Sequence, residues 1–243
     1  MLGEIEVIEK KTDSYPGDKL CSEGLRAFIE ATVKDRTAKI KGSIYELRAL
    51  IEDFRMQIIG GMQGAIDLYE ACIISSLLSN CGTWTEITVK EEKLLSDLQN
   101  TFCRALLQVP CSAPKPSLRA SFGLLGMKWR VMEAKVLLVM AIRSQEEGGL
   151  AKEVLEEQLA LGYPGLGQEV REICAEIGIP DASRMDVQKE EVKEAIKLNH
   201  LKKLKEEMRE KEKPSDMVKL DLRKPQEYTS WRDEELEHFK RPE

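Results

Sequence analysis

The sequence has few aromatic residues and no long apolar run. Only 5% of its 243 residues are aromatic, so few positions can stack on nucleic-acid bases. The longest apolar stretches, around residues 71–78 and 136–142, are too short to span a bilayer. The acidic first residues also lack the apolar core of a signal peptide. We therefore expect an intracellular protein, in the cytoplasm or nucleus, with no membrane partner.

Residues that build common catalytic and metal sites are scarce as well. The chain has no Asp-Asp dipeptide, and the glycines at 60, 61 and 64 lack the Lys of a phosphate-binding loop. His200 and His238 are isolated, and none of the six cysteines forms a Cys-x-x-Cys pair, which argues against zinc. We expect reduced, partly buried cysteines, no metal, no cofactor and no catalytic activity from this chain alone.

The overall charge gives no general attraction for phosphate. The net charge is −6, from 37 basic and 43 acidic residues, so any nucleic-acid contact must come from a local basic patch. The chain is 42% hydrophobic and 33% charged, values that are typical of a folded protein with long helices.

Apolar residues recur at helical spacing from Leu25 to about Met208. The first helix ends at Gly60-Gly61, and Gly42 either divides it or only weakens it. A second helix spans about residues 63–80, and Thr88 with Glu91 forms a capping box for a third. Further helices are expected at 127–146, 150–161, 167–177 and 187–211. We predict an all-α protein, in which a small helical bundle is followed by further helices.

The only β element we expect lies before residue 22. Ile5 and Val7 alternate with glutamates, and Tyr15-Pro-Gly-Asp is a turn sequence. A short N-terminal β-hairpin and a loose surface turn both fit this pattern.

The stretch 98–135 is the most informative part of the chain. It contains a Leu-rich helix, a Pro/Ser-rich break at residues 110–116, and a helix entered through Gly-Leu-Leu-Gly. In order and spacing it resembles the segment after the polymerase core of LINE-type (non-LTR) retrotransposon reverse transcriptases. The positions that carry the resemblance are Leu98, Arg104, Leu106, Leu107, Pro114, Leu118, Gly123, Leu124, Arg130 and Lys135.

The resemblance also extends beyond this stretch, over roughly residues 15–239. Leu77, Leu78, Asn80 and Trp84 match the end of a thumb helix in that family, whose pattern places a short helix between the break and the Gly-Leu. The turn Tyr15-Pro-Gly-Asp stands where the family has Tyr-Leu-Gly, so the Leu→Pro difference puts its primer-gripping hairpin in doubt. The resemblance implies four parts: a palm remnant or hairpin (1–22), a thumb-like bundle (23–109), a post-thumb linker region (110–213) and a polar tail (214–243).

This resemblance implies a function without catalysis. The family's catalytic palm needs an Asp pair to bind Mg²⁺, and this sequence has neither that pair nor enough strand for a palm. It therefore resembles a non-catalytic thumb and linker fragment that holds template–primer nucleic acid. Two alternatives stay open: part of an active reverse transcriptase whose other domains are not in this sequence, and a host helical scaffold for protein interactions. Oligomeric state stays open too.

The first helix carries the basic residues that best fit a nucleic-acid contact. Lys34, Lys41, Arg48 and Arg55 recur every seven residues, so they share one face if the helix is continuous. Arg36 and Lys39 lie to either side. Such a row predicts weak binding to RNA or RNA–DNA duplex through phosphate contacts. The alternative is an ordinary solvated face, in which nearby acidic residues cancel the field.

A second basic group surrounds the Pro-rich break. Arg104 and Arg130 match positions of the family pattern that lie near template RNA, and Lys115, Arg119 and Lys128 are their neighbours. Alternatively, these side chains cover the helical hairpin and pair with Glu133 or with helix C-termini.

Two features near the C-terminal end complete the predictions. Lys and Glu alternate over residues 187–211 with nearly balanced charge, which we interpret as a solvated helix rather than a row of phosphate contacts. In the polar residues after Pro214, Trp231 and Phe239 can dock on the core or on another domain.

Overall fold

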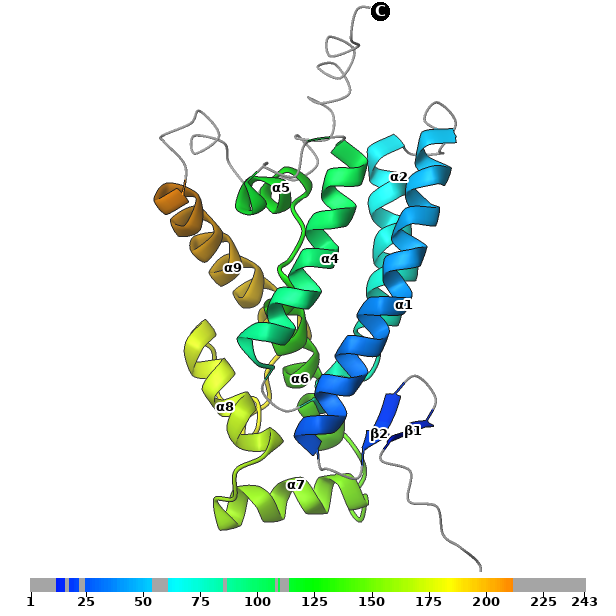
Figure 1. The fold of residues 1–243 in the computed structure, drawn as a ribbon. Helices are drawn as coiled ribbons and strands as arrows, with labels where there is room; N and C mark the ends of the chain where they lie inside the picture. Colours follow the sequence, from blue (N-terminus) through cyan, green and yellow to red (C-terminus); the bar gives the residue numbers. More distant parts are fainter. Residues whose placement is uncertain are drawn as a thin grey trace, which may run out of the picture.

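The described part of the protein is predominantly helical (Figure 1). The computed structural model describes residues 12–15, 18–21, 25–53, 61–84, 87–107, 109 and 114–211. This architecture confirms the predicted all-α class. No helix among the described residues has the length and apolar character needed to cross a membrane.

A small β-hairpin, one of the two alternatives that the sequence left open, precedes the first helix; the alternating residues Ile5 and Val7 lie outside the described part. Strands β1 (Thr12–Tyr15) and β2 (Asp18–Cys21) are antiparallel, with Thr12 opposite Cys21 and Tyr15 opposite Asp18. Strand β2 contacts α1. The two residues that join the strands lie outside the described part.

Helix α1 (Leu25–Asp53) is continuous. Gly42 does not divide it: the glycine is exposed, and a Cβ added there would meet nothing within 4 Å. Ile29, Val33, Ile40 and Ile44 form its buried stripe, as the three- and four-residue steps predicted. The predicted extension of this helix to Gly60 lies outside the described residues.

The second predicted helix is also present, with an irregular middle. It consists of α2 (Gly61–Leu68), the π-helical turn η1 (Tyr69–Ile74) and α3 (Ser75–Leu77). Asn80 follows in the left-handed region with φ 56° and leads into the 3₁₀ turn η2 (Cys81–Thr83). Asn tolerates this conformation better than most residues, which explains why the helix stops here.

Helix α4 (Val89–Leu107) begins with the predicted capping box. The backbone N–H of Thr88 donates to Oε2 of Glu91 at 2.7 Å, and the N–H of Glu91 points to Oγ1 of Thr88 at 3.4 Å. These contacts satisfy backbone donors that the first helical turn leaves free. In the core, Phe102 of α4 stacks on Tyr69 with ring centroids 3.9 Å apart.

The helices after the break lie close to their predicted bounds. The short helix α5 (Lys115–Phe122) occupies the place that the resemblance gives it. It is followed by α6 (Met127–Arg143), α7 (Leu150–Leu161), α8 (Leu166–Ile177) and α9 (Lys189–Lys211). Gly123 (φ 61°) ends α5 in a conformation that favours glycine.

Two large apolar cores organise these helices, and a small third cluster of Ala120, Leu204 and Met208 joins α5 to α9. The first joins α1, the α2–α3 helix, α4, α5 and the start of α6, and the second joins α6, α7, α8 and α9. Helix α6 contributes to both, because Val131 belongs to the first core and Met132 to the second. The predicted division of the chain at residues 109/110 stays a prediction.

Helix α9 differs from the solvated helix that we predicted. One face of it is buried, and the residues on this face recur every four positions: Val192, Ile196, His200, Leu204 and Met208. This face packs on α6 and α5. The balanced charges lie on the rest of the helix surface, so the prediction was correct for that surface and wrong for the packed face.

Candidate nucleic-acid interface and an interhelical cavity

The solvent face of α1 carries two of the predicted phosphate-binding residues. Lys34 and Lys41 are both exposed. Because α1 is continuous, they lie two turns apart, about 10.5 Å along the axis. Position 48 continues the same spacing within α1, although its side chain is outside the described part, and so is the whole of Arg55.

Acidic residues partly offset the charge beside this face. Lys39 forms an ion pair with Asp35 at 2.7 Å, one helical turn away. Lys90 of α4 pairs with Glu30 at 2.9 Å. These exposed pairs contribute little to stability, but they show that basic side chains flanking Lys34 and Lys41 are already matched by carboxylates.

Arg36 does not lie on the exposed face where we predicted it. Its side chain is buried, and Nη1 donates to the backbone oxygens of Leu77, at 3.2 Å, and Ser79. The guanidinium also lies 5.6 Å from the ring centroid of Trp84. Arg36 therefore holds the end of the second helix against α1, because it supplies donors to carbonyls that the helix terminus leaves free.

The basic side chains around the break also bind to the protein itself. The observed ion pairs are Lys115–Asp97 (2.6 Å), Arg119–Glu207 (2.9 Å), Lys128–Glu176 (3.6 Å) and Arg130–Glu70. Arg104 is half-buried, and its Nε has no hydrogen-bond partner among the described residues. Internal pairing, one of the two alternatives from the sequence, thus describes Lys115, Arg119, Lys128 and Arg130, although their ion-pair partners are neither Glu133 nor helix ends.

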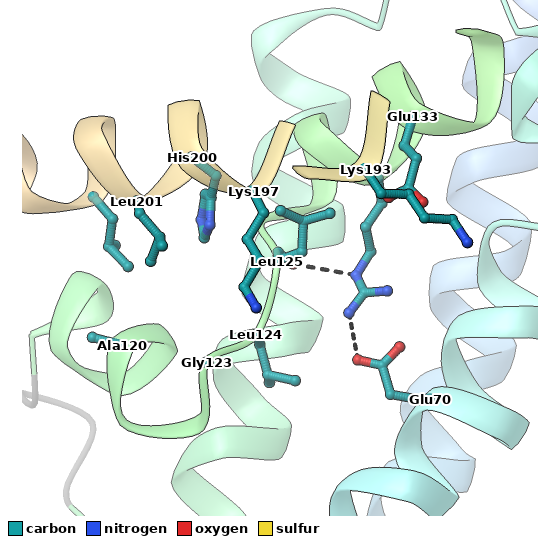
Figure 2. A pocket seen from close by; sticks show the side chains of 12 residues that line it. Glu70, Ala120, Gly123, Leu124, Leu125, Glu133, Lys193, Lys197, His200 and Leu201 are labelled. Carbon is teal, nitrogen blue, oxygen red and sulfur yellow. Dashed lines mark hydrogen bonds and ion pairs between the residues drawn. The ribbon is translucent and has the colours of Figure 1, made fainter. Parts of the chain in front are cut away.

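A cavity of about 320 Å³ lies between α9 and the connection from α5 to α6 (Figure 2). Leu124, Leu201 and Leu204 supply much of its apolar surface. The charged and titratable side chains that line it are Glu70, Arg130, Glu133, Lys193, Lys197 and His200. Figure 2 shows Lys197 and His200 extending from α9 toward the connection.

Arg130 fixes one wall of the cavity. Its Nε donates to the backbone oxygen of Leu125 at 3.2 Å, and Nη2 pairs with the carboxylate of Glu70. Nearby, burial raises the pKa of the Glu133 carboxyl, while Lys193 and Arg130 act in the opposite direction. The predicted nucleic-acid contact Arg130 is therefore a structural part of an internal site.

His200 joins α9 to the α5–α6 connection. The backbone N–H of Gly126 donates to Nε2 of His200 at 3.2 Å, and Trp129 meets the imidazole edge-on with centroids 6.1 Å apart. Burial, together with the charges of Arg119 and Arg130, lowers the pKa of His200 to about 4. The ring is neutral at physiological pH and acts as a hydrogen-bond acceptor.

Sequence reasoning did not identify this cavity. Lys193 and Lys197 were read as part of a solvated helix, and Glu70 and Glu133 belong to elements far apart in the chain. His200 alone carried a signal, because it falls on the four-residue spacing of the buried face of α9.

No group of three or more His, Cys, Asp or Glu side chains among the described residues is arranged to hold a metal ion. Burial raises the pKa of the Cys81 thiol to about 11 and that of Cys103 to about 12, so both stay protonated and unreactive. Comparisons with protein-family models, curated proteins and solved structures find no match to this chain.

Proposed function

We propose that the chain is a non-catalytic, thumb-like fragment of a LINE-type reverse transcriptase that holds RNA–DNA or RNA duplex through the solvent face of α1. One observation supports this most directly. Helix α1 runs without interruption through Gly42, so the seven-residue spacing of Lys34, Lys41 and position 48 becomes a straight row.

The row matches a phosphate backbone better than it matches base edges. Its members are about 10.5 Å apart, and flexible basic side chains at such spacing contact phosphates without reading sequence. Arg36 and Arg130 are engaged inside the protein, and Arg104 is half-buried. The proposed contact is therefore limited to Lys34, Lys41, Arg48 and, beyond α1, Arg55.

The proposal is tested by titrating the full chain with a labelled RNA–DNA hybrid and following fluorescence anisotropy. Contacts with about three phosphates release counterions, so affinity is expected to fall roughly 10- to 40-fold between about 50 and about 200 mM salt. The variant Lys41→Glu/Arg48→Glu is expected to lose most binding, at least about tenfold, while circular dichroism shows unchanged helicity.

A matched control separates a local contact from a change in overall charge. Lys189→Glu/Lys202→Glu alters the net charge equally at two exposed positions of α9, and Figure 1 shows α9 and α1 on opposite sides of the molecule. The control is expected to bind nearly as well as the unaltered chain. Equal losses in both double variants, or no loss in either, would contradict the proposed interface.

A further inference from the structure

Helix α7 carries an apolar stripe on its solvent side. Leu150, Val154 and Leu161 are 76%, 43% and 56% exposed. Their spacing of four and seven residues places them within about 40° of one another around the helix axis. Tyr163, which is also exposed, adjoins the end of this stripe, because its backbone N–H donates to the backbone oxygen of Gln158 at 3.1 Å.

The stripe is distinct from the face that holds α7 on the protein. Leu155 and Leu159 lie on the inner side, in the core that α7 shares with α6 and α8. A surface helix ordinarily turns one apolar stripe to the core and polar residues to solvent. Figure 1 shows α7 at the lower end of the molecule, crosswise to α1. Ten large apolar side chains are exposed among the described residues, and four of them lie within residues 150–163. Such clustering marks an interaction surface.

Acidic residues border the stripe. Glu153 and Glu157 are exposed, and the helical spacing places both within about 60° of Leu150 around the axis. Lys152, the one basic residue of α7, lies on the opposite side, where its Nζ donates to the backbone oxygen of Gln145 at 3.3 Å. The solvent side of α7 therefore combines apolar contact area with negative charge.

This combination distinguishes three kinds of partner. Two copies joined through the stripe would bring the same glutamates together across a two-fold axis, and like charges at an interface oppose association. Helices that lie on membranes carry basic polar faces, because the lipid surface that they meet is negative. A helix with an apolar stripe and basic flanks complements both the apolar side chains and the carboxylates of α7.

We infer that the solvent side of α7 docks a basic amphipathic helix of another protein. The apolar side chains of that helix contact Leu150, Val154 and Leu161, and its Lys or Arg side chains pair with Glu153 and Glu157. Because α7 is only about 18 Å long, whereas stable interfaces bury about 800 Å² per partner, the contact is a transient one. This inference is independent of the proposed nucleic-acid contact, which lies on α1, and its test uses no nucleic acid.

Titration of the full chain with two labelled helical peptides, followed by fluorescence anisotropy, tests the apolar part of the contact. Both probes carry Leu along one face; the other positions are Ala and Lys in one probe and Ala and Glu in the other. The Lys probe is expected to bind at least about tenfold more tightly than the Glu probe. Val154→Ser/Leu161→Ser is expected to lower the affinity for the Lys probe at least about tenfold. The control Met185→Ser/Leu198→Ser, at two exposed apolar positions outside α7, is expected to leave it unchanged.

Charge reversal tests the acidic border. Glu153→Lys/Glu157→Lys is expected to reverse the preference, so that the Glu probe binds more tightly than the Lys probe. The control Glu190→Lys/Glu194→Lys changes the net charge equally at two exposed positions of α9 and is expected to keep the preference for the Lys probe. Circular dichroism checks that each variant is folded.

Three results would overturn the inference. The first is an equal effect of a double variant and its control, or no effect of either, on peptide binding. The second is self-association of the unaltered chain that Val154→Ser/Leu161→Ser abolishes, which would assign the stripe to a second copy. The third is binding to phosphatidylserine-containing vesicles that the same variant abolishes, which would assign the stripe to a membrane surface.

Discussion

The basic side chains of α1 and those that follow the Pro-rich break are used differently. On α1, Lys34 and Lys41 are exposed to solvent at regular spacing. After the break, Lys115, Arg119 and Arg130 each pair with an acidic residue of another helix. The same residue types are thus exposed to solvent on α1, whereas after the Pro-rich break they form ion pairs that join helices.

The difference is clearest where burial is deepest. The side chain of Lys135 on α6 is only 5% exposed and pairs with Glu169 of α8, which is 26% exposed. A cation in such a place stabilises the fold only while its partner remains, because an unpaired buried charge is costly. Burial and ion pairing together separate these basic residues from the exposed Lys34 and Lys41.

The largest expected effect comes from Arg36, the buried basic residue of α1. Arg36→Ala is expected to lower the free energy of unfolding by about 3–4 kcal/mol, because it removes hydrogen bonds from a charged group to two carbonyls and a contact with Trp84. Chemical denaturation followed by circular dichroism measures the change.

Lys34→Ala is the matched control, two residues away on the exposed face of the same helix. It is expected to change stability by no more than about 0.5 kcal/mol. Similar losses of unfolding free energy in both variants would show that buried and exposed cations on α1 contribute equally to stability.

The next effect is a dependence of stability on pH through His200. Its pKa is about 4 in the folded protein against an ordinary value of 6.5 for histidine, so the unfolded chain binds the proton first as pH falls. The stabilising contribution is therefore complete above about pH 6.5 and decreases toward pH 4, by at most about 3 kcal/mol. Denaturation curves at several pH values across this window measure it.

His200→Gln isolates this contribution, because Gln retains an acceptor for the N–H of Gly126 but does not titrate. The difference in stability between the two chains is expected to change with pH across the window. Parallel pH profiles would show that burial and the charges of Arg119 and Arg130 do not lower the pKa of His200.

The smallest of the three effects concerns the ion pair between α6 and α8. Glu169→Gln keeps the size and an acceptor for Lys135, but it removes the charge. We expect a loss of about 1–2 kcal/mol, less than for a fully buried pair because Glu169 is partly exposed. Thermal unfolding at neutral pH measures it, and Glu172→Gln, a change at an exposed position of the same helix, is the control. A Glu169→Gln variant as stable as the control would show that Lys135 is solvated well enough to stand alone.

Local signals in the sequence predicted much of the fold. The capping box of Thr88 and Glu91 lies within four consecutive residues, and Asn80 stops a helix by its own conformational preference. Such features depend on neighbours along the chain, so sequence alone locates them. The helix bounds after the break follow from glycine and proline in the same way.

The roles of the charged residues were harder to predict, because they depend on partners far along the chain. Arg36 occupies a position three after Val33 and four before Ile40, within the buried stripe of α1, so its spacing did carry a signal. Arg130 and Glu70 are 60 residues apart, and Arg119 and Glu207 are 88 apart. No periodicity in the sequence indicates that these residues are in contact. The cavity could not be predicted for the same reason, because the Arg130–Glu70 pair forms part of its lining.

The ion pair between the start of α1 and the start of α4 can form only late in the synthesis of the chain. The guanidinium of Arg26 donates to the carboxylate of Glu91, which lies 65 residues later in the chain. At about 5–20 residues per second a ribosome needs roughly 3–13 s to add that length. Until then the ion pair between Arg26 and Glu91 is missing. The α2–α3 helix is the first long element that can pack on the apolar stripe of α1. The nascent chain is therefore most exposed to aggregation and to chaperones before α4 emerges.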